Sequence, residues 1–421
     1  MHQKTTLPNG LRIVTQKLSS TQSVTLLILV KAGSRCETQR IRGISHFLEH
    51  MFFKGTKKYP DTKAVSGTID GIGGEFNAFT GKEYVGYYVK VAAEHRGVAM
   101  DVMADMLMTA KHDPKEIDKE RGVIMEEYNM YQDTPMYQVG WDFEKLVFGD
   151  QPLGWDQIGL KEVILNVTRE DFHAYQADLY RPDNMVVTVA GNVEHAEVVK
   201  EVERLFPMEA KATEFQWKSV EGNGAKERVI LQEKKTEQGH VVVGFPAYPE
   251  QHPDHWAVKL LAVILGGNMS SRMFLNVREA HGLAYYISTS TDDYTDTGLI
   301  STRAGVALDR VDQAVKAIVA EYRDIAEAPV PEAELQKAKD YYKGKMVLKL
   351  EDSEEYAHLL GQKEVLYGKV VTPEEIEAAL EKVTVEDVLR VAKDLIKPDR
   401  IYLAGIGPWA EKARFEGLLG F

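Results

Sequence analysis

The sequence has very little cysteine and no excess of positive charge. Cys36 is the single cysteine of the 421 residues, so an intrachain disulfide is excluded, and this fits a reducing compartment. Lys and Arg number 51 against 64 Asp and Glu, and the resulting net charge of −13 argues against a nucleic-acid partner. Composition therefore leaves proteins, peptides and small molecules as the partners to consider.

Long apolar runs are also missing. The longest early run, residues 24–30, is too short to cross a bilayer and predicts a buried strand. The first ten residues contain no apolar stretch typical of a secretory signal. We therefore expect a cytoplasmic protein that does not enter a membrane.

The length and the order of predicted elements indicate two domains. Hydrophobic residues make up 44% and charged residues 27% of the chain, as in ordinary globular proteins, and 421 residues exceed one ordinary core. Residues 209–227 are polar, contain Gly222 and Gly224 and lack an apolar period, which predicts a linker between domains 1–208 and 228–421. Strands and helices follow in a similar order on both sides. We expect an α+β fold built from a duplicated unit.

Residues 46–50 read His46-Phe47-Leu48-Glu49-His50 and carry the strongest chemical signal. Two histidines at i and i+4 with a glutamate at i+3 share one helical face, which can hold a divalent metal beside a carboxylate. HxxEH is the inverse of the HExxH zincin motif and is known as the inverzincin pattern. The alternative is a pair of hydrogen-bonded helix histidines. That alternative leaves a glutamate on an apolar face without a partner, which is costly.

A catalytic zinc ion needs a third protein ligand. We expect it on the helix that begins at Asp113, where three glutamates compete. At roughly 100° per residue, one stripe of this helix holds Ile117, Glu120, Ile124, Glu127 and Tyr131. Glu126 falls away from the stripe and is predicted to be solvated. Glu127 is the predicted ligand, and Glu120 is a candidate for orienting a ligand or shuttling a proton; a buried salt bridge is the alternative explanation of the two inward carboxylates.

These segments resemble the M16 peptidases, the group of pitrilysin and insulin-degrading enzyme. The resemblance is greatest to two-domain members such as the β subunit of mitochondrial processing peptidase, and it is carried by residues 46–56, 77–80 and 120–127. It implies two homologous domains, each a mostly antiparallel β-sheet packed with α-helices, and zinc-dependent endopeptidase activity with one Zn²⁺ per chain. In the family, the third zinc ligand follows another glutamate by seven residues, which matches Glu127 and Glu120.

The second half resembles the family as well. Residues 266–274 and 277–285 are similar to the family segment that supplies an arginine and a tyrosine to the active site, here Arg278 and Tyr285. The residues alone would predict a surface charge on a helix and the start of a strand. Because one chain carries both segments, the resemblance implies peptide substrates and a homodimer, with a heterodimer of paralogous M16 subunits as the alternative.

The predicted chemistry is hydrolysis of a peptide bond. Glu49 would act as the general base, and Tyr285 or Arg278 would stabilise the developing oxyanion. The predicted strand 75–79 would bind an extended substrate by strand addition, through Asn77, Ala78 and Phe79.

Two other classes of protein are alternatives to a zinc-dependent peptidase. One is a proteolytically inactive structural subunit with the same fold, which usually lacks part of the motif that is complete here. The other is a structural zinc site in a binding protein. Structural zinc sites are closed by four protein ligands, commonly cysteines, and the lone Cys36 lies outside the motif.

Overall fold

The computed structural model describes residues 2–221 and 227–420 as two compact units. Unit 1 comprises Met1–Asn129, Asp156–Lys218 and Val347–Thr372; unit 2 comprises Met130–Trp155, Ser219–Met346 and Pro373–Phe421. The glycines predicted to mark the linker, Gly222 and Gly224, lie outside the described residues.

Unit 1 is built on a six-stranded sheet whose strands lie side by side in the order β1-β2-β6-β3-β5-β4. Their bounds are Gln3–Thr6 (β1), Arg12–Lys17 (β2), Met185–Gly191 (β6), Ser23–Val30 (β3), Val85–Ala92 (β5) and Glu75–Thr80 (β4). Only β2 and β6 pair in parallel, and the other neighbours are antiparallel. The apolar run 24–30 is the buried strand β3, as predicted.

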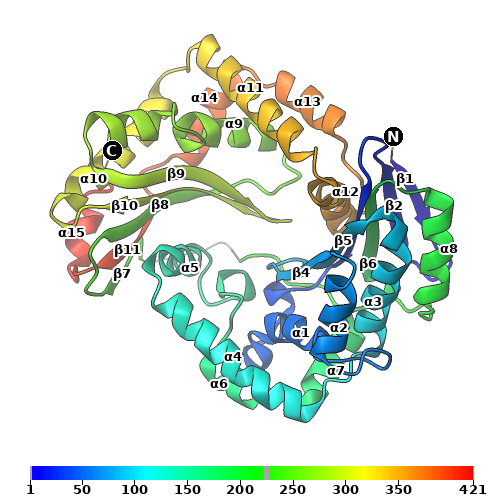
Figure 1. The fold of residues 1–421 in the computed structure, drawn as a ribbon. Coiled ribbons are helices and arrows are strands. Elements are labelled where there is room, and N and C mark those ends of the chain that lie inside the picture. Colours follow the sequence, from blue (N-terminus) through cyan, green and yellow to red (C-terminus); the bar gives the residue numbers. More distant parts are fainter. Residues whose placement is uncertain (1, 222–226, 421) are drawn as a thin grey trace. The chain divides into compact units, whose positions relative to one another are not determined.

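The helices of unit 1 are α1 (Ile44–Phe52), α2 (Thr62–Asp70), α3 (Arg96–Thr109), most of α4 (Pro114–Gln132), α6 (Lys161–Asn166), α7 (Arg169–Leu179), α8 (His195–Leu205) and α12 (Ser353–Tyr367). Of these, α1, α2, α3, α8 and α12 pack directly on strands of the sheet (Figure 1). Burial follows the strand period of two. On β3, Leu26 and Ile28 lie on the face opposite to Leu27 and Leu29, which pack in one apolar cluster with α12.

Unit 2 repeats the same connectivity. Its sheet has the order β7-β11-β8-β10-β9, with bounds Val229–Glu233 (β7), Tyr402–Gly407 (β11), Gly239–Ala247 (β8), Gly298–Val306 (β10) and Ala284–Asp293 (β9). The first and last strands again pair in parallel, beside three antiparallel pairs. The order matches β2-β6-β3-β5-β4 of unit 1 strand for strand, so the α+β fold is duplicated, as predicted from the element order.

The helices of unit 2 include one seven-residue π-helix, Phe274–Ala280. The α-helices are α5 (Pro135–Phe148), α9 (His255–Gly266), α10 (Val311–Glu327), most of α11 (Glu332–Lys349), α13 (Pro373–Glu381), α14 (Val385–Leu395) and α15 (Lys412–Glu416). No helix among the described residues is long and apolar enough to cross a membrane.

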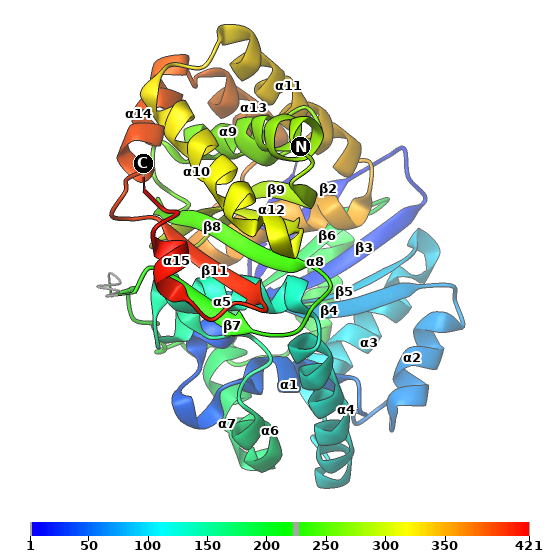
Figure 2. The same cartoon turned by 90° about the vertical axis from the view of Figure 1, so that its left-hand side faces the viewer.

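The units differ from the predicted domains 1–208 and 228–421 because two helices are exchanged (Figures 1 and 2). The late helix α12 packs on the sheet of unit 1, where Ala357 and Leu360 join the apolar cluster of β3. The early helix α5 packs on the sheet of unit 2, where Phe143 meets β8 and β11. An apolar helix face can be recognised in a sequence, but its periodicity does not say which sheet the face will cover.

Candidate metal centre

The motif lies on α1, whose apolar side chains are buried in the core of unit 1. Gly43 precedes the helix with a φ of 97°, a left-handed conformation that favours glycine. A Cβ there would also lie 2.7 Å from the carbonyl oxygen of Ile158, so this position has no room for a side chain. The buried carboxyl group of Glu37 accepts hydrogen bonds from the backbone N–H groups of Gly43 (2.7 Å) and Ser45 (2.9 Å). The start of the helix is thereby fixed in place.

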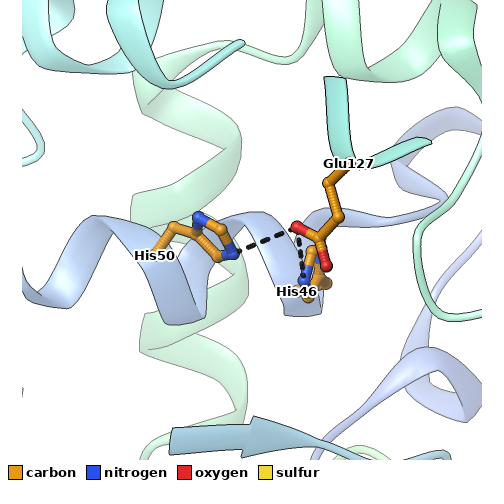
Figure 3. Close-up of side chains that lie close together, drawn as sticks. All are labelled: His46, His50 and Glu127. Carbon is orange, nitrogen blue, oxygen red and sulfur yellow. Dashed lines mark ion pairs between the residues drawn. The ribbon is translucent and has the colours of Figure 1, made fainter. Parts of the chain in front are cut away.

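The three residues predicted to be metal ligands, His46, His50 and Glu127, lie close together (Figure 3). The two imidazoles project from the same face of α1, with ring centroids 4.7 Å apart. Glu127 approaches from α4, and its Oε2 lies 3.6 Å from Nε2 of each histidine. Glu126, the neighbouring glutamate, is exposed, in agreement with the stripe geometry.

The donor set fits a zinc ion. Ligand atoms about 2.0–2.1 Å from a tetrahedral metal lie roughly 3.3 Å from one another, and the 3.6 Å separations are close to that value. Burial and the neighbouring His50 lower the pKa of His46 to about 3, against the opposing charge of Glu120, so this imidazole is neutral and able to coordinate. Two imidazoles and one carboxylate leave a fourth position free, as catalytic zinc sites require.

Glu120 contacts His50 and lies on α4, seven residues before Glu127. Its Oε1 lies 2.8 Å from His50 Nδ1, and its Oε2 lies 2.6 Å from Lys54 Nζ. Burial opposes the charged form of Glu120, but the hydrogen bonds from His50 and Lys54 outweigh it and lower the pKa of the carboxyl group. An ionised Glu120 fixes the His50 ring so that Nε2 faces Glu127, which is the arrangement in which carboxylates orient metal-binding histidines.

Glu49 lies on the same helix, beside the three candidate ligands. It accepts a hydrogen bond from the Thr80 hydroxyl at the end of β4, and it interacts electrostatically with His50 and Glu127. Burial raises the pKa of Glu49, and the charge of Glu127 adds to the rise, while Thr80 and His50 oppose it. A carboxyl group with a raised pKa is a stronger proton acceptor, which suits a general base.

The remaining predicted residues lie elsewhere. Asn77, Ala78 and Phe79 lie on β4, the strand at one edge of the unit 1 sheet. Arg278 and Tyr285 belong to unit 2: Arg278 lies in the π-helix with its guanidinium over the Phe274 ring, and Tyr285 lies at the start of β9 with 73% of its surface exposed. Within unit 1 the structure brings together His46, Glu49, His50, Glu120 and Glu127.

Two supporting residues were not predicted from the sequence, Glu37 and Thr80. Glu37 lies six residues before the glycine that starts α1, beyond the usual spacing of a capping box, so no local pattern identifies it as the group that holds the helix. Thr80 is the last residue of β4, and only the folded sheet places its hydroxyl group beside Glu49.

Replacing Glu37 by alanine should destabilise the protein. The change leaves the backbone N–H groups of Gly43 and Ser45 buried without acceptors, and we expect the free energy of unfolding to fall by about 2–4 kcal/mol. Chemical denaturation of Glu37→Ala against the exposed-surface variant Glu126→Ala measures this. An unchanged midpoint of Glu37→Ala would contradict the capping role.

Two family profiles match the chain. The profile described as "Insulinase (Peptidase family M16)" matches residues 12–151, and that of the "Peptidase M16 inactive domain" matches residues 166–342. An uncharacterized zinc protease of Streptomyces coelicolor is 36% identical to the chain, covering 97% of it and 90% of the relative. The uncharacterized zinc protease YmxG of Bacillus subtilis is also 36% identical, over 95% of the chain and 97% of its own length.

Solved structures share the fold. A protease from Helicobacter pylori superposes with a TM-score of 0.89 at 24% identity, over 97% of this chain and 99% of that one. A peptidase M16 inactive domain from Pseudomonas fluorescens gives a TM-score of 0.90 at 16% identity, over 97% of this chain and 98% of that one. The profiles and the relatives show the family, and the solved structures share its fold. The chain belongs to peptidase family M16, as a two-domain member.

Proposed function

We propose that the protein is a zinc-dependent metalloendopeptidase that cleaves peptides or unfolded protein segments. The observation that carries this proposal is the convergence of His46, His50 and Glu127 beside Glu49 in one unit. The relatives named zinc proteases support the same activity and metal. His46, His50 and Glu127 would hold one Zn²⁺ per chain.

The roles of the residues follow from their surroundings. A bound zinc ion would polarise the scissile carbonyl group and acidify water. Glu49, buried and with a raised pKa, takes a proton from the attacking water and passes it to the leaving amine. The Thr80 hydroxyl donates to one carboxylate oxygen of Glu49 and so leaves the other free for that proton. Glu120 holds His50 in the coordinating orientation.

Substrate would bind along β4. In the described sheet, β4 pairs with β5 on one side only, so backbone groups of its other edge are free to pair with an extended chain. Asn77 is exposed there, and its side-chain oxygen accepts a hydrogen bond from the Ala78 N–H, a donor that a substrate carbonyl group could use instead. The end of this strand at Thr80 leads directly to Glu49.

Arg278 and Tyr285 would stabilise the oxyanion that develops on the scissile carbonyl group. The active form would be a dimer. Both proposals rest on the resemblance of residues 266–285 to the family segment with these roles. The exposure of Tyr285 leaves its hydroxyl group available to a substrate. Gel filtration with an activity assay on the single purified protein tests self-sufficiency: an active homodimer is expected, and a stable, inactive monomer would point to a paralogous partner subunit.

The second candidate is an inactive structural subunit of an M16 assembly. The name of the profile that matches residues 166–342, an inactive domain, is the observation in its favour. That match begins after the motif and after Glu127, so it does not bear on the candidate ligands. The complete donor set makes the peptidase the better-supported function.

Metal analysis combined with peptide cleavage tests the proposal. We expect about one zinc per purified chain, cleavage of a quenched fluorescent peptide, loss of cleavage with a chelator and recovery when zinc is added. Cleavage that persists after the metal has been stripped would contradict the mechanism. A protein that contains zinc but cleaves no peptide would favour the structural subunit.

A further inference from the structure

Unit 1 contains a cavity of about 450 Å³ whose lining includes none of the residues of the candidate metal centre. This cavity, the basic pocket, lies at one end of the sheet: β2 begins there with Arg12, β3 ends just before Lys31, and Asn184 immediately precedes β6. Residues of the segment 213–217 and of the end of α12 also line it. Phe215 of this segment is exposed, so the pocket can be reached from solvent.

Lys31 is a cation of this pocket that the protein leaves without a counter-ion. Among the described residues its ammonium group makes no hydrogen bond and no ion pair, and Nζ lies 4.6 Å from the centroid of the Trp217 ring. Its backbone is fixed, because Lys31 donates to the Asn184 carbonyl group (3.0 Å) and the Asn184 amide donates to that of Lys31 (2.8 Å). Burial lowers the pKa of Lys31, against the opposing charge of Glu83. An anion in the pocket would offset the cost of this half-buried charge.

The other charged groups around the pocket are already engaged. The Arg12 guanidinium donates to the carbonyl oxygens of Glu364 (2.6 Å) and Asp183 (3.1 Å), and its Nε–H is buried without an acceptor. The fully buried carboxylate of Glu364 is paired with Lys4 at 2.7 Å. The charged side chains that line the pocket are Arg12, Lys31 and Asp183. They leave one positive charge, which a monoanion would balance.

One wall of the pocket is aromatic. Phe215 and Trp217 belong to the segment between α8 and β7, and Asp183 holds this segment in place: its two carboxylate oxygens accept from the N–H and the hydroxyl group of Thr213, each at 2.8 Å. Trp217 also packs against the apolar cluster of β3 and α12. Aromatic rings offer a ligand apolar contact area, and the volume lies within the range of about 300–1,000 Å³ that is usual for small-molecule sites.

The basic pocket and the candidate metal centre lie on opposite sides of the sheet. Leu27 and Leu29 of β3 face α12, and strand alternation places Lys31 on that side, where Trp217 joins the same apolar cluster. The Thr80 hydroxyl points to the other side, to Glu49 on α1. A ligand in the pocket would therefore be separated from the metal centre by the sheet.

We propose that the basic pocket binds a carboxylate that carries an aromatic or aliphatic body, with Lys31 recognising the charge. A carboxylate is a monoanion at neutral pH and matches the single unbalanced charge, whereas a phosphate monoester carries about −1.5 to −2. The body packs on the rings of Phe215 and Trp217. Two sources share this chemistry: a free small acid, and the C-terminal residue of a peptide. The proposal does not depend on the proposed peptidase function.

Calorimetric titration with N-acetylphenylalanine tests the proposal without turnover. We expect a Kd below about 1 mM. The uncharged N-acetylphenylalaninamide should bind about tenfold more weakly or worse, because it brings no charge to Lys31. Acetate, which has the charge but no body, should be weaker by a similar factor. Equal binding of the acid and the amide, or of the acid and acetate, would overturn the proposal.

Variants of Lys31 separate recognition of the anion from a structural role. Lys31→Gln should weaken binding of the acid about tenfold or more and leave the amide unchanged, and Lys31→Arg should keep most of the affinity. Lys218→Gln is the matched control, because Lys218 is exposed and does not line the pocket. The unfolding midpoint of Lys31→Gln should not fall, since no ion pair is lost. A preference for the acid that survives Lys31→Gln, or a lower midpoint with equal loss of acid and amide binding, would overturn the proposal.

A six-residue peptide that ends in phenylalanine distinguishes the two sources. It is titrated with a free and with an amidated C-terminus, on protein with the Glu49→Gln change so that it is not cleaved. If the free-acid peptide binds at least as tightly as N-acetylphenylalanine and Lys31→Gln weakens it, the site takes C-terminal residues. Binding of the small acid alone identifies a free acid as the ligand. If neither binds with a Kd below about 10 mM, the pocket is not a carboxylate site.

Discussion

A Glu49→Gln variant is expected to retain its zinc and lose peptide cleavage by a factor of about 10²–10⁴. Glutamine has nearly the volume of glutamate and can still accept the hydrogen bond from Thr80, so the helix and the three candidate ligands keep their places. It cannot take a proton from water, and the step assigned to Glu49 is lost. Metal content by mass spectrometry and the initial rate of peptide cleavage measure the two quantities on one sample.

Thr80→Val is the matched comparison for Glu49→Gln. It removes the hydroxyl group from Glu49 but keeps the carboxylate and the strand shape, so it should reduce the rate much less than Glu49→Gln. If Glu49→Gln keeps wild-type activity, the base lies elsewhere. If it loses zinc together with activity, Glu49 supports the metal site and its role as a base is not the reason for the loss.

The convergence of the three candidate ligands could be anticipated because helical geometry is local. The spacing of His46 and His50 fixes their common face, and the stripe through Glu120 and Glu127 separates the latter from Glu126 before any tertiary structure is known. The fold then brings these faces of α1 and α4 together, because Glu127 Oε2 lies 3.6 Å from Nε2 of both histidines.

The parts that could not be predicted depend on distant contacts. Glu37 fixes the start of α1 from a turn whose position follows from the fold, and the Thr80 hydroxyl reaches Glu49 only once β4 has joined the sheet. The exchange of α5 and α12 between the units is also invisible locally, since an apolar helix face fits either sheet. The face of β4 that meets α12 exists only because of this exchange.

Among residues 2–221 and 227–420, the duplicated fold carries the cluster of candidate metal ligands in unit 1 and not in unit 2. In unit 1, α1 follows β3, and the helix in the same place in unit 2 is α9, which follows β8. Most of α9 is buried and apolar, and its one histidine, His255, faces Asp293 at 3.8 Å. The same strand order therefore carries a helix with two candidate metal ligands in one unit and a packing helix in the other. Side chains, and not the fold, decide where chemistry is possible.

Replacing Glu127 by alanine should remove the metal, and Glu126→Ala should not. The two glutamates are neighbours on α4, but Glu127 points at both imidazoles while Glu126 is exposed. Loss of the one anionic candidate ligand leaves only the two imidazoles, and we expect zinc content to fall from about one per chain to a small fraction, with activity lost in parallel. Zinc titration followed by calorimetry, with circular dichroism to show that both variants are folded, measures the difference. Equal zinc affinity in the two variants would mean that Glu127 is not a ligand.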